Sequence, residues 1–225
     1  MTKKAFTLIE LLVVIAIISL LVSVLMPSLA GARDLAKAAV CMTQQKQIGL
    51  GLFAYLEDND QFFPSVNITV GETSERLKWQ FALRDYCYID GNWTGNNFDA
   101  AAAGVFHCPG DDHRLERGYA PASYAGNYYA DCRWADLTET NYVAKMSTVA
   151  EPAVKVYATD SYNRGGGYAH LNTKCPEFLP TSTQAYGIDF RHKDGAQTLF
   201  MDLHVETLTI QDTLNNAGLI YPLRY

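Results

Sequence analysis

The sequence Lys3-Lys4-Ala5-Phe6-Thr7-Leu8-Ile9-Glu10 runs directly into an apolar stretch that continues from Leu11 to Met26. The residues from Phe6 to Met26 are all apolar except Thr7, Glu10, Ser19 and Ser23. This stretch matches the roughly 20 residues that a helix needs to cross the hydrocarbon core of a bilayer. It therefore predicts a membrane-spanning helix at the N-terminus.

The charges around this stretch predict its orientation and identify one unusual residue. Lys3 and Lys4 precede it and no lysine or arginine lies within it, so we expect the N-terminus in the cytoplasm. Glu10 is the exception, because a carboxylate at bilayer depth costs about 2.5–3.5 kcal/mol on insertion scales. Since the apolar stretch contains no cation, we expect the partner of Glu10 to come from elsewhere.

Residues 3–12 resemble the class III prepilin signal of type IV pilins and type II secretion pseudopilins. The resemblance implies that prepilin peptidase cleaves between Ala5 and Phe6 on the cytoplasmic side, and that the new amine of Phe6 is N-methylated. It also implies that Glu10 pairs with the N-terminal amine of a neighbouring subunit during filament assembly. Ala5 stands where the family usually has glycine, and its small side chain is compatible with processing.

Two other interpretations compete with this one. An ordinary secretory signal has an apolar region of roughly 7–15 residues, and Ser28-Leu29-Ala30 before Gly31 has the form of its cleavage site. The apolar stretch is too long for such a signal. A plain uncleaved anchor explains the length, but neither alternative gives Glu10 a role.

Composition predicts one ordinary globular domain beyond the anchor. The chain has 225 residues, of which 48% are hydrophobic and 19% charged, so extended disorder is not expected. The formal net charge of −6 argues against nucleic acid as a partner. No motif of a nucleophilic hydrolase or zinc protease occurs, so the chain is not expected to be an enzyme.

The helix is expected to continue beyond the membrane. Pro27 kinks a membrane helix more often than it ends one. A mostly apolar stripe then recurs at steps of three and four: Leu35, Ala38, Met42, Gln45, Gly49, Leu52 and Leu56. We therefore predict a cleaved leader at 1–5, a transmembrane or filament-core helix at 6–26, its amphipathic continuation at 27–58, and a globular head at 59–225.

A second resemblance covers most of the head. Pilin-like proteins of planctomycete-type bacteria carry a His-x9-Asp-Gly element near the C-terminus, and His192 and Asp202 have that spacing here. Other segments resemble the same proteins in the same order, namely 41–64, 106–111, 123–127 and 154–160. The two resemblances imply an α+β fold, in which a long N-terminal helix packs on a small antiparallel sheet.

The C-terminal element has the clearest strand pattern. Residues 190–201, with Asp194-Gly195 in the middle, predict a hairpin. Leu203 stands where the second resemblance expects glycine, and leucine resists positive φ. The chain at Leu203 therefore either forms another kind of turn or continues as a bent strand.

The same element holds the candidate site residues His192, Asp202 and His204. These three side chains are predicted to form a hydrogen-bond clasp of the hairpin, and the alternatives are a metal site or an acid–base site. Calcium is a separate alternative, because major pseudopilins bind it in a C-terminal loop. No ligands are assigned, since no acidic spacing of the EF-hand type occurs.

Five cysteines follow the apolar stretch, so at least one is left without an intramolecular partner. An oxidising compartment favours pairing, and the spacing gives little support for structural zinc. Connectivity does not follow from the sequence. The resemblance implies a disulfide between Cys41 and Cys108, which resembling proteins often carry.

Together these patterns predict a structural subunit of a type IV pilus-like or type II secretion pseudopilus filament. Its partners are prepilin peptidase, an inner-membrane assembly platform, the lipid bilayer and other pilin-type subunits, including copies of itself. The expected location is the bacterial inner membrane with the head in the periplasm, and afterwards the filament. The alternative is a pilin-type anchor that carries a ligand-binding or enzymatic head.

Overall fold

The computed structural model describes residues 7–64, 68–69, 76–77, 79–88, 104–111, 123–127, 145–163, 170–171, 186–193 and 195–215. The chain divides into two compact units, Met1–Ala36 and Lys37–Tyr225. The division lies inside the first helix and not at residue 59, where the sequence places the start of the head. The physical reason is that the last turns of the helix carry the buried face of the second unit.

Helix α1 runs without a break from Leu8 to Asp58 and includes Pro27, as expected. Its end is formed by two non-glycine residues in the left-handed region, Asp60 (φ 51°) and Gln61 (φ 66°). The Gln61 N–H donates to the Leu56 carbonyl at 2.8 Å, which satisfies one of the carbonyl groups left unpaired at a helix C-terminus. Among the described residues, α1 is the one helix long and apolar enough to cross a membrane.

The buried face of α1 differs in part from the predicted stripe. Its buried residues are Cys41, Gln45, Ile48, Gly49, Gly51, Leu52 and Leu56. Four of these were in the stripe, but Leu35 is 55% exposed because the buried face begins only at Cys41. Side chains three or four positions apart lie on one side of a helix, so the buried residues form one continuous contact.

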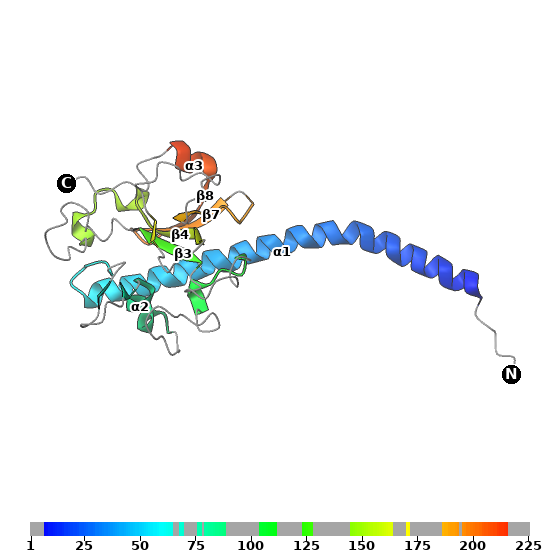
Figure 1. Ribbon diagram of the computed structural model, residues 1–225, viewed down its shortest axis with the longest axis horizontal. Coiled ribbons are helices and arrows are strands. Elements are labelled where there is room, and N and C mark those ends of the chain that lie inside the picture. The colour runs from blue at the N-terminus through cyan, green and yellow to red at the C-terminus, as the bar shows by residue number, and fades with distance from the viewer. Residues whose placement is uncertain are drawn as a thin grey trace. The chain divides into compact units, whose positions relative to one another are not determined.

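A six-stranded sheet forms the centre of the second unit (Figure 1). Along the sheet the order is β5-β3-β4-β7-β8, and β6 also pairs with β4. Every pairing is antiparallel except β3 with β5. The bounds are β3 Tyr124–Asn127, β4 Val156–Asn163, β5 His170–Leu171, β6 Tyr186–Ile188, β7 Gly195–Phe200 and β8 Val205–Thr209. The expected α+β class, a long helix on a small antiparallel sheet, is confirmed.

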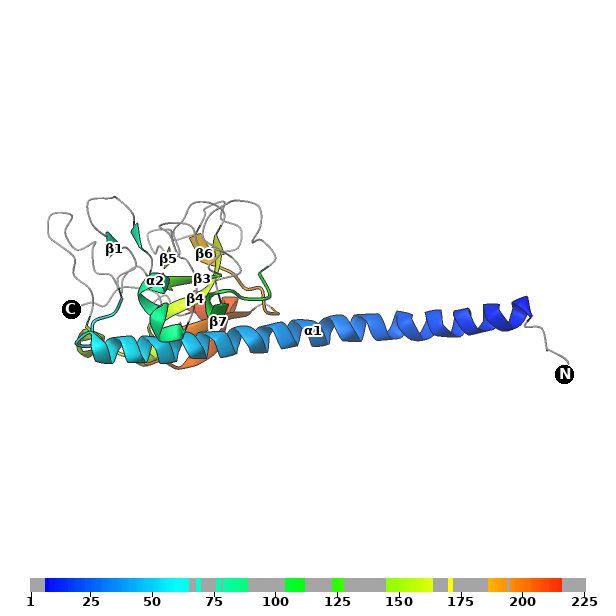
Figure 2. The same ribbon diagram turned by 90° about the horizontal axis from the view of Figure 1, so that it is seen from below.

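Short elements complete the described part. They are β1 Ile68–Thr69 with β2 Arg76–Leu77, α2 Trp79–Leu83, α3 Ile210–Asn215, and the 3-10 turns Asp85–Cys87, Gly104–Phe106, Met146–Thr148 and Pro152–Val154. Figure 2 shows α2 and the sheet beside the C-terminal part of α1.

The predicted hairpin of residues 190–201 is wrong. The strand before Asp194-Gly195 is β6, which ends at Ile188 and pairs with β4. Among the described residues of 190–201, one isolated bridge, His192 with Gly195, joins the two sides. The hairpin is instead β7–β8, whose loop contains Leu203 at φ 76°.

This loop has the form of a three-residue hairpin connection. The Leu203 N–H donates to the Phe200 carbonyl at 3.0 Å, and the Phe200 N–H donates to the His204 carbonyl at 2.9 Å. Such loops place a left-handed residue after a turn, and glycine is favoured there. Of the two expectations for Leu203, the turn is therefore the one adopted, although leucine occupies the glycine position.

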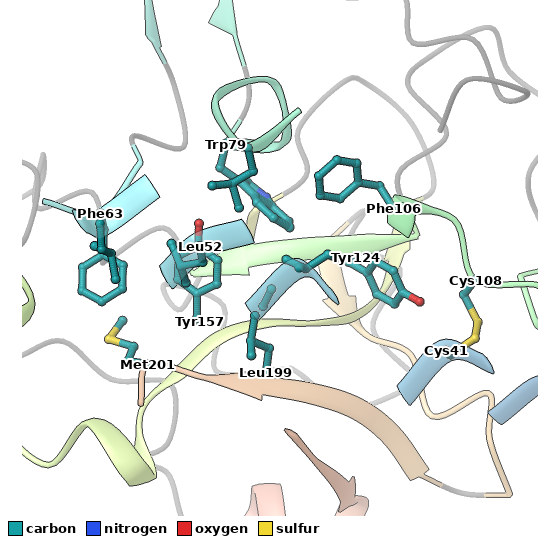
Figure 3. Packing of buried hydrophobic residues seen from close by; sticks show 14 of the residues in the cluster. Cys41, Leu52, Phe63, Trp79, Phe106, Cys108, Tyr124, Tyr157, Leu199 and Met201 are labelled. Atoms are coloured by element: carbon teal, nitrogen blue, oxygen red, sulfur yellow. A yellow bond between two sulfur atoms is a disulfide. The ribbon is translucent and has the colours of Figure 1, made fainter. Parts of the chain in front are cut away.

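The sheet has an apolar cluster on each face, because alternate side chains of a strand point to opposite sides. The larger cluster joins α1 to the sheet and is built around aromatic residues (Figure 3). Trp79 contacts Phe106 and Tyr157 edge-on, with ring centroids 5.5 and 5.6 Å apart. The second cluster contains Ala125, Val156, Ile188, Ala196, Phe200 and Leu208.

Candidate functional site

The N-terminal end of α1 is closed by a reciprocal pair of side chains. The backbone N–H and the hydroxyl of Thr7 donate to Oε2 of Glu10 at 2.9 and 2.8 Å. The backbone N–H of Glu10 donates to the Thr7 hydroxyl at 3.3 Å. This is a capping box, in which two otherwise unpaired N–H groups are satisfied. Ala5 and Phe6, the predicted cleavage and methylation positions, lie outside the described residues.

The capping box changes the expectation for Glu10. Its carboxylate has hydrogen-bond partners within its own first turn, whereas the sequence argument looked for a partner elsewhere. The pattern Thr-x-x-Glu before an apolar stretch is the usual sequence signal of such a box, and Thr7 could have been found by it. Its partners here are neutral groups, so a cation from another subunit would still add a charge interaction.

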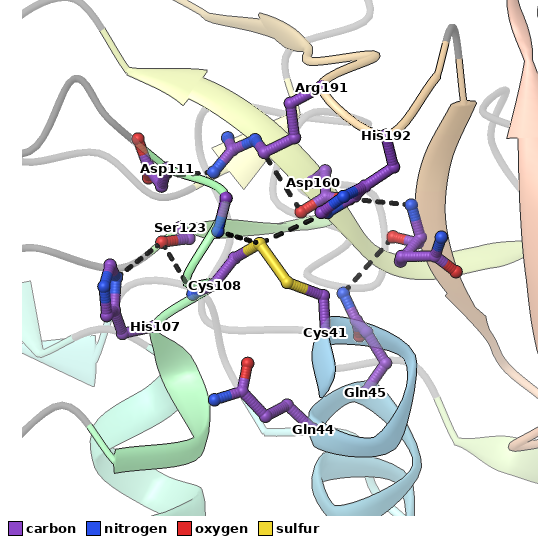
Figure 4. The surroundings of a disulfide bond; sticks show 12 residues. Cys41, Gln44, Gln45, His107, Cys108, Asp111, Ser123, Asp160, Arg191 and His192 are labelled. Carbon is purple, nitrogen blue, oxygen red and sulfur yellow. Dashed lines mark hydrogen bonds and ion pairs between the residues drawn. A yellow bond between two sulfur atoms is a disulfide. The ribbon is translucent and has the colours of Figure 1, made fainter. Parts of the chain in front are cut away.

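A disulfide between Cys41 and Cys108 joins α1 to the segment before β3 (Figure 4). It is the pair that the resemblance implies. Both residues are fully buried. Cys108 is further held by Ser123, whose hydroxyl accepts the Cys108 N–H at 3.0 Å. The bond therefore ties the helix to the sheet inside the larger apolar cluster.

His192 lies against this disulfide. Its Nε2 is 3.2 Å from Sγ of Cys108 and 3.5 Å from Oδ2 of Asp160. The Gly110 N–H donates to the same sulfur at 3.3 Å. Burial and, to a smaller extent, the positive charges of Arg191 and Lys37 lower the pKa of His192 to about 4. The imidazole is therefore neutral at pH 7.

Asp160 is the buried carboxylate of the same cluster. Its Oδ2 accepts the Gln197 N–H at 2.7 Å, and Arg191 Nε is 3.9 Å from its Oδ1. Burial raises the pKa of Asp160 to about 7, although Arg191 and the Gln197 hydrogen bond act in the opposite direction. Arg191 also pairs with Asp111 at 2.9 Å and with Asp189 at 3.0 Å. One buried guanidinium is thus surrounded by three carboxylates.

The predicted site of His192, Asp202 and His204 does not come together. His192 precedes β7 and the other two residues follow it, and six strand residues span about 20 Å. Asp202 and His204 do contact each other through Oδ1 and Nδ1. The His204 ring stacks on the Phe200 ring, with their centroids 4.3 Å apart. A local clasp of the β7–β8 turn is present, but His192 belongs to the disulfide cluster instead.

The sequence argument missed the residues that surround His192. Asp160, Arg191 and Gln197 come from different strands and turns, so no local spacing connects them. In the sequence, Asp160 is only the last residue of the resembling segment 154–160. The adjacent Arg191 and His192 were the one available signal, and it is weak.

Cys87 is a free thiol in the described part of the chain. Burial raises its pKa to about 12, so it stays protonated and unreactive at neutral pH. It lies against α1, where a Cβ on Gly51 would come within 2.6 Å of its sulfur. Cys132 and Cys175 are outside the described residues.

Residues 1–26 match the family model described as the prokaryotic N-terminal methylation motif. The match covers the predicted leader and the apolar stretch, and it makes this segment a class III prepilin signal. No curated protein and no solved structure matched the chain. The comparisons therefore speak to the N-terminal segment and not to the head.

Proposed function

Because residues 1–26 carry the class III prepilin signal of pilins and pseudopilins, we propose that the chain is a structural subunit of a filament. The filament is of the type IV pilus or type II secretion pseudopilus kind. Prepilin peptidase cleaves the chain between Ala5 and Phe6, and the Phe6 amine is then methylated.

The observation that carries this proposal is the exposure of the apolar side chains in the N-terminal part of α1. Every large apolar side chain from Leu8 to Met26 is between 41% and 79% exposed within its unit. Apolar surface on all sides of a helix must be covered by lipid or by other helices. A membrane-stored subunit that later packs into a helical filament core meets this requirement in both states.

Glu10 gives the assembly its axial register. Lipid cannot satisfy a carboxylate, and the Thr7 groups bonded to Glu10 are neutral. The N-terminal amine of an adjacent subunit is a cation that reaches this depth only in an assembled filament. Subunits aligned on this pair are therefore favoured over other registers.

The membrane supplies the storage site, and the head lies on the far side from the cytoplasm. The lysines before the apolar stretch favour this orientation. A disulfide between Cys41 and Cys108 supports it as well, because such bonds persist in oxidising compartments.

The alternative, a binding or enzymatic head on a pilin-type anchor, would be favoured by a polar pocket around His192 and Asp202. Since these residues lie at opposite ends of β7, that feature does not support it.

The test is to express the full chain with an active prepilin peptidase or with an inactivated one, and to measure its intact mass and first residue. The proposal expects a chain that begins at N-methylated Phe6 only with the active enzyme, followed by filaments in the sheared fraction. Processing without filaments would overturn the structural role. A chain that still begins at Met1 or begins at Gly31 would overturn the pathway itself.

A further inference from the structure

The disulfide cluster brings together the ligand atoms of a metal site. The sulfurs of Cys41 and Cys108 and a ring nitrogen of His192 lie within 4.8 Å of one another, and all three residues are buried. They come from three separate segments, namely α1, the turn after Phe106, and the turn before β7 (Figure 4). Two cysteines and a histidine are a ligand set that zinc prefers.

The ligand set has three members, and the buried carboxylate of Asp160 lies beside it. Oδ2 of Asp160 is 3.5 Å from Nε2 of His192, but the group of ligand atoms within 4.8 Å of one another is formed by Cys41, Cys108 and His192. Three protein ligands with water in the fourth position are a common zinc arrangement.

We propose that, when Cys41 and Cys108 are reduced, they bind a zinc ion together with His192, and that water takes the fourth position. Zn–S bonds of about 2.3 Å and Zn–N bonds of about 2.0 Å place tetrahedral ligand atoms roughly 3.3–3.8 Å apart. The observed separation of 3.2 Å between Cys108 Sγ and His192 Nε2 is close to this range. The two bonded sulfurs must separate by rotation of their side chains.

A group that orients a zinc ligand is also present. The Gly110 N–H donates to the Cys108 sulfur at 3.3 Å, and such a donor stabilises a bound thiolate. Two thiolates and a neutral imidazole around Zn²⁺ leave no net charge, so the buried ion needs no further counter-ion.

Zinc and the disulfide exclude each other, because both use the same sulfurs. Zinc binding to the dithiol form displaces two protons and forms two Zn–S bonds. Oxidation by a small-molecule or protein disulfide reverses this: the two cysteine sulfurs each give up one electron and bond to each other, the oxidant becomes two thiolates, and Zn²⁺ leaves. The buried cluster thus has a metal-bound reduced state and a metal-free oxidised state.

The test uses the full chain in detergent with Cys87, Cys132 and Cys175 replaced by serine, so that Cys41 and Cys108 are the remaining thiols. The chain is reduced with a phosphine and titrated with Co²⁺, which reports ligand type by its absorption. We expect one equivalent of Co²⁺ with thiolate-to-cobalt and tetrahedral bands, and its displacement by Zn²⁺. The oxidised chain is expected to show no such bands.

Variants identify the ligands. His192→Ala is expected to weaken Co²⁺ binding by roughly 100-fold or more, since it removes a direct ligand. His107→Ala is the matched control, because His107 adjoins Cys108 in sequence but contacts the Ser123 hydroxyl at 3.1 Å. The His107→Ala variant should bind Co²⁺ with the affinity of the parent. His192→Cys should restore binding with a stronger charge-transfer band from a third thiolate.

The proposal is overturned by any of three results. They are absent tetrahedral bands in the reduced parent, equal binding by the oxidised chain, and unchanged affinity in His192→Ala. If His192→Ala does not fold, His192→Cys decides the matter, because an unaltered cobalt spectrum there would exclude position 192 as a ligand.

Discussion

The ring of His192 lies directly over the backbone of Gly110: a Cβ added at position 110 would come within 2.8 Å of Cε1 of the imidazole. Residue 110 must therefore lack a side chain for His192 to reach the Cys108 sulfur. The contact is between two turns far apart in the sequence, and it defines where the imidazole can be.

Gly110→Ala is expected to displace His192 and to destabilise the oxidised chain by roughly 1–3 kcal/mol, the usual cost of overpacking. Urea unfolding of the full chain in detergent, followed by near-ultraviolet circular dichroism, measures this. Gly31→Ala is the matched control, because a Cβ there meets nothing within 4 Å and alanine is a better helix former. Equal midpoints for the two variants would contradict the contact.

Removing the disulfide should lower the free energy of unfolding more than Gly110→Ala does. Cys41 and Cys108 are separated by 67 residues, and closing a loop of that size stabilises a fold by about 4 kcal/mol in the chain-entropy model. The double variant Cys41→Ser with Cys108→Ser is expected to lose stability of this order in urea unfolding without reductant. Cys87→Ser alters a free thiol and should change the midpoint far less. A small loss in the double variant would show that the bond contributes little.

The pH dependence of stability should reveal His192. Its folded pKa of about 4 is below its ordinary value of 6.5, so the stability it contributes is present above pH 6.5 and is lost as the pH falls toward 4. The stability difference between the oxidised parent and His192→Gln should therefore shrink by roughly 3 kcal/mol over that interval. Asp160 titrates in both proteins with the opposite slope, so the comparison of the two proteins reduces its contribution. A constant difference from pH 8 to pH 4 would refute the burial effect.

Leu203 is strained by its positive φ but packs on the larger apolar cluster. Leu203→Gly removes the strain and the packing together, and these opposing effects are each on the order of 1 kcal/mol. Leu203→Val keeps much of the packing but places a β-branched residue in the left-handed region. We expect the valine variant to be less stable than the glycine variant by about 1–2 kcal/mol. The reverse order of thermal midpoints would mean that packing outweighs backbone conformation here.

Glu10→Ala should insert into the membrane normally but assemble poorly. Thr7→Ala removes the capping hydroxyl, at a cost of about 1 kcal/mol to the helix start, but leaves the carboxylate charge. The filament yield should therefore fall in the order parent, Thr7→Ala, Glu10→Ala. The sheared fraction and the membrane fraction are compared by quantitative immunoblot. Parental filament yield in Glu10→Ala would remove its role in registration.

The long helix could be predicted because its signals are local. The apolar stretch, the capping pair and the apolar stripe at steps of three and four residues each involve residues that are close together in the sequence. The pairing of β6 could not be predicted in this way. Alternation identifies a strand but not its partner. β6 joins the last residues of β4, 161–163, across more than twenty residues, while β7 pairs with the earlier part of the same strand.

The disulfide cluster was beyond sequence reasoning for the same reason. His192 was recognised, but it was grouped with Asp202 because both belong to one short motif. Its real neighbours, Asp160 and Cys108, lie more than thirty and eighty positions away. At Leu203 the sequence left two geometries open, and the hydrogen bonds of the turn decided between them.

The position of Cys41 also has a mechanical consequence. If the chain serves as the proposed filament subunit, tension pulls on it through its N-terminal helix, and that load enters the second unit near Lys37, four residues before Cys41. From Cys41 the force passes through a covalent bond to residue 108 and so to the segment that leads into β3. The turns of α1 beyond Cys41 are shielded, because they lie inside the loop that the bond closes. Pulling from the N-terminus therefore cannot peel this part of the helix away from the sheet while the bond is intact.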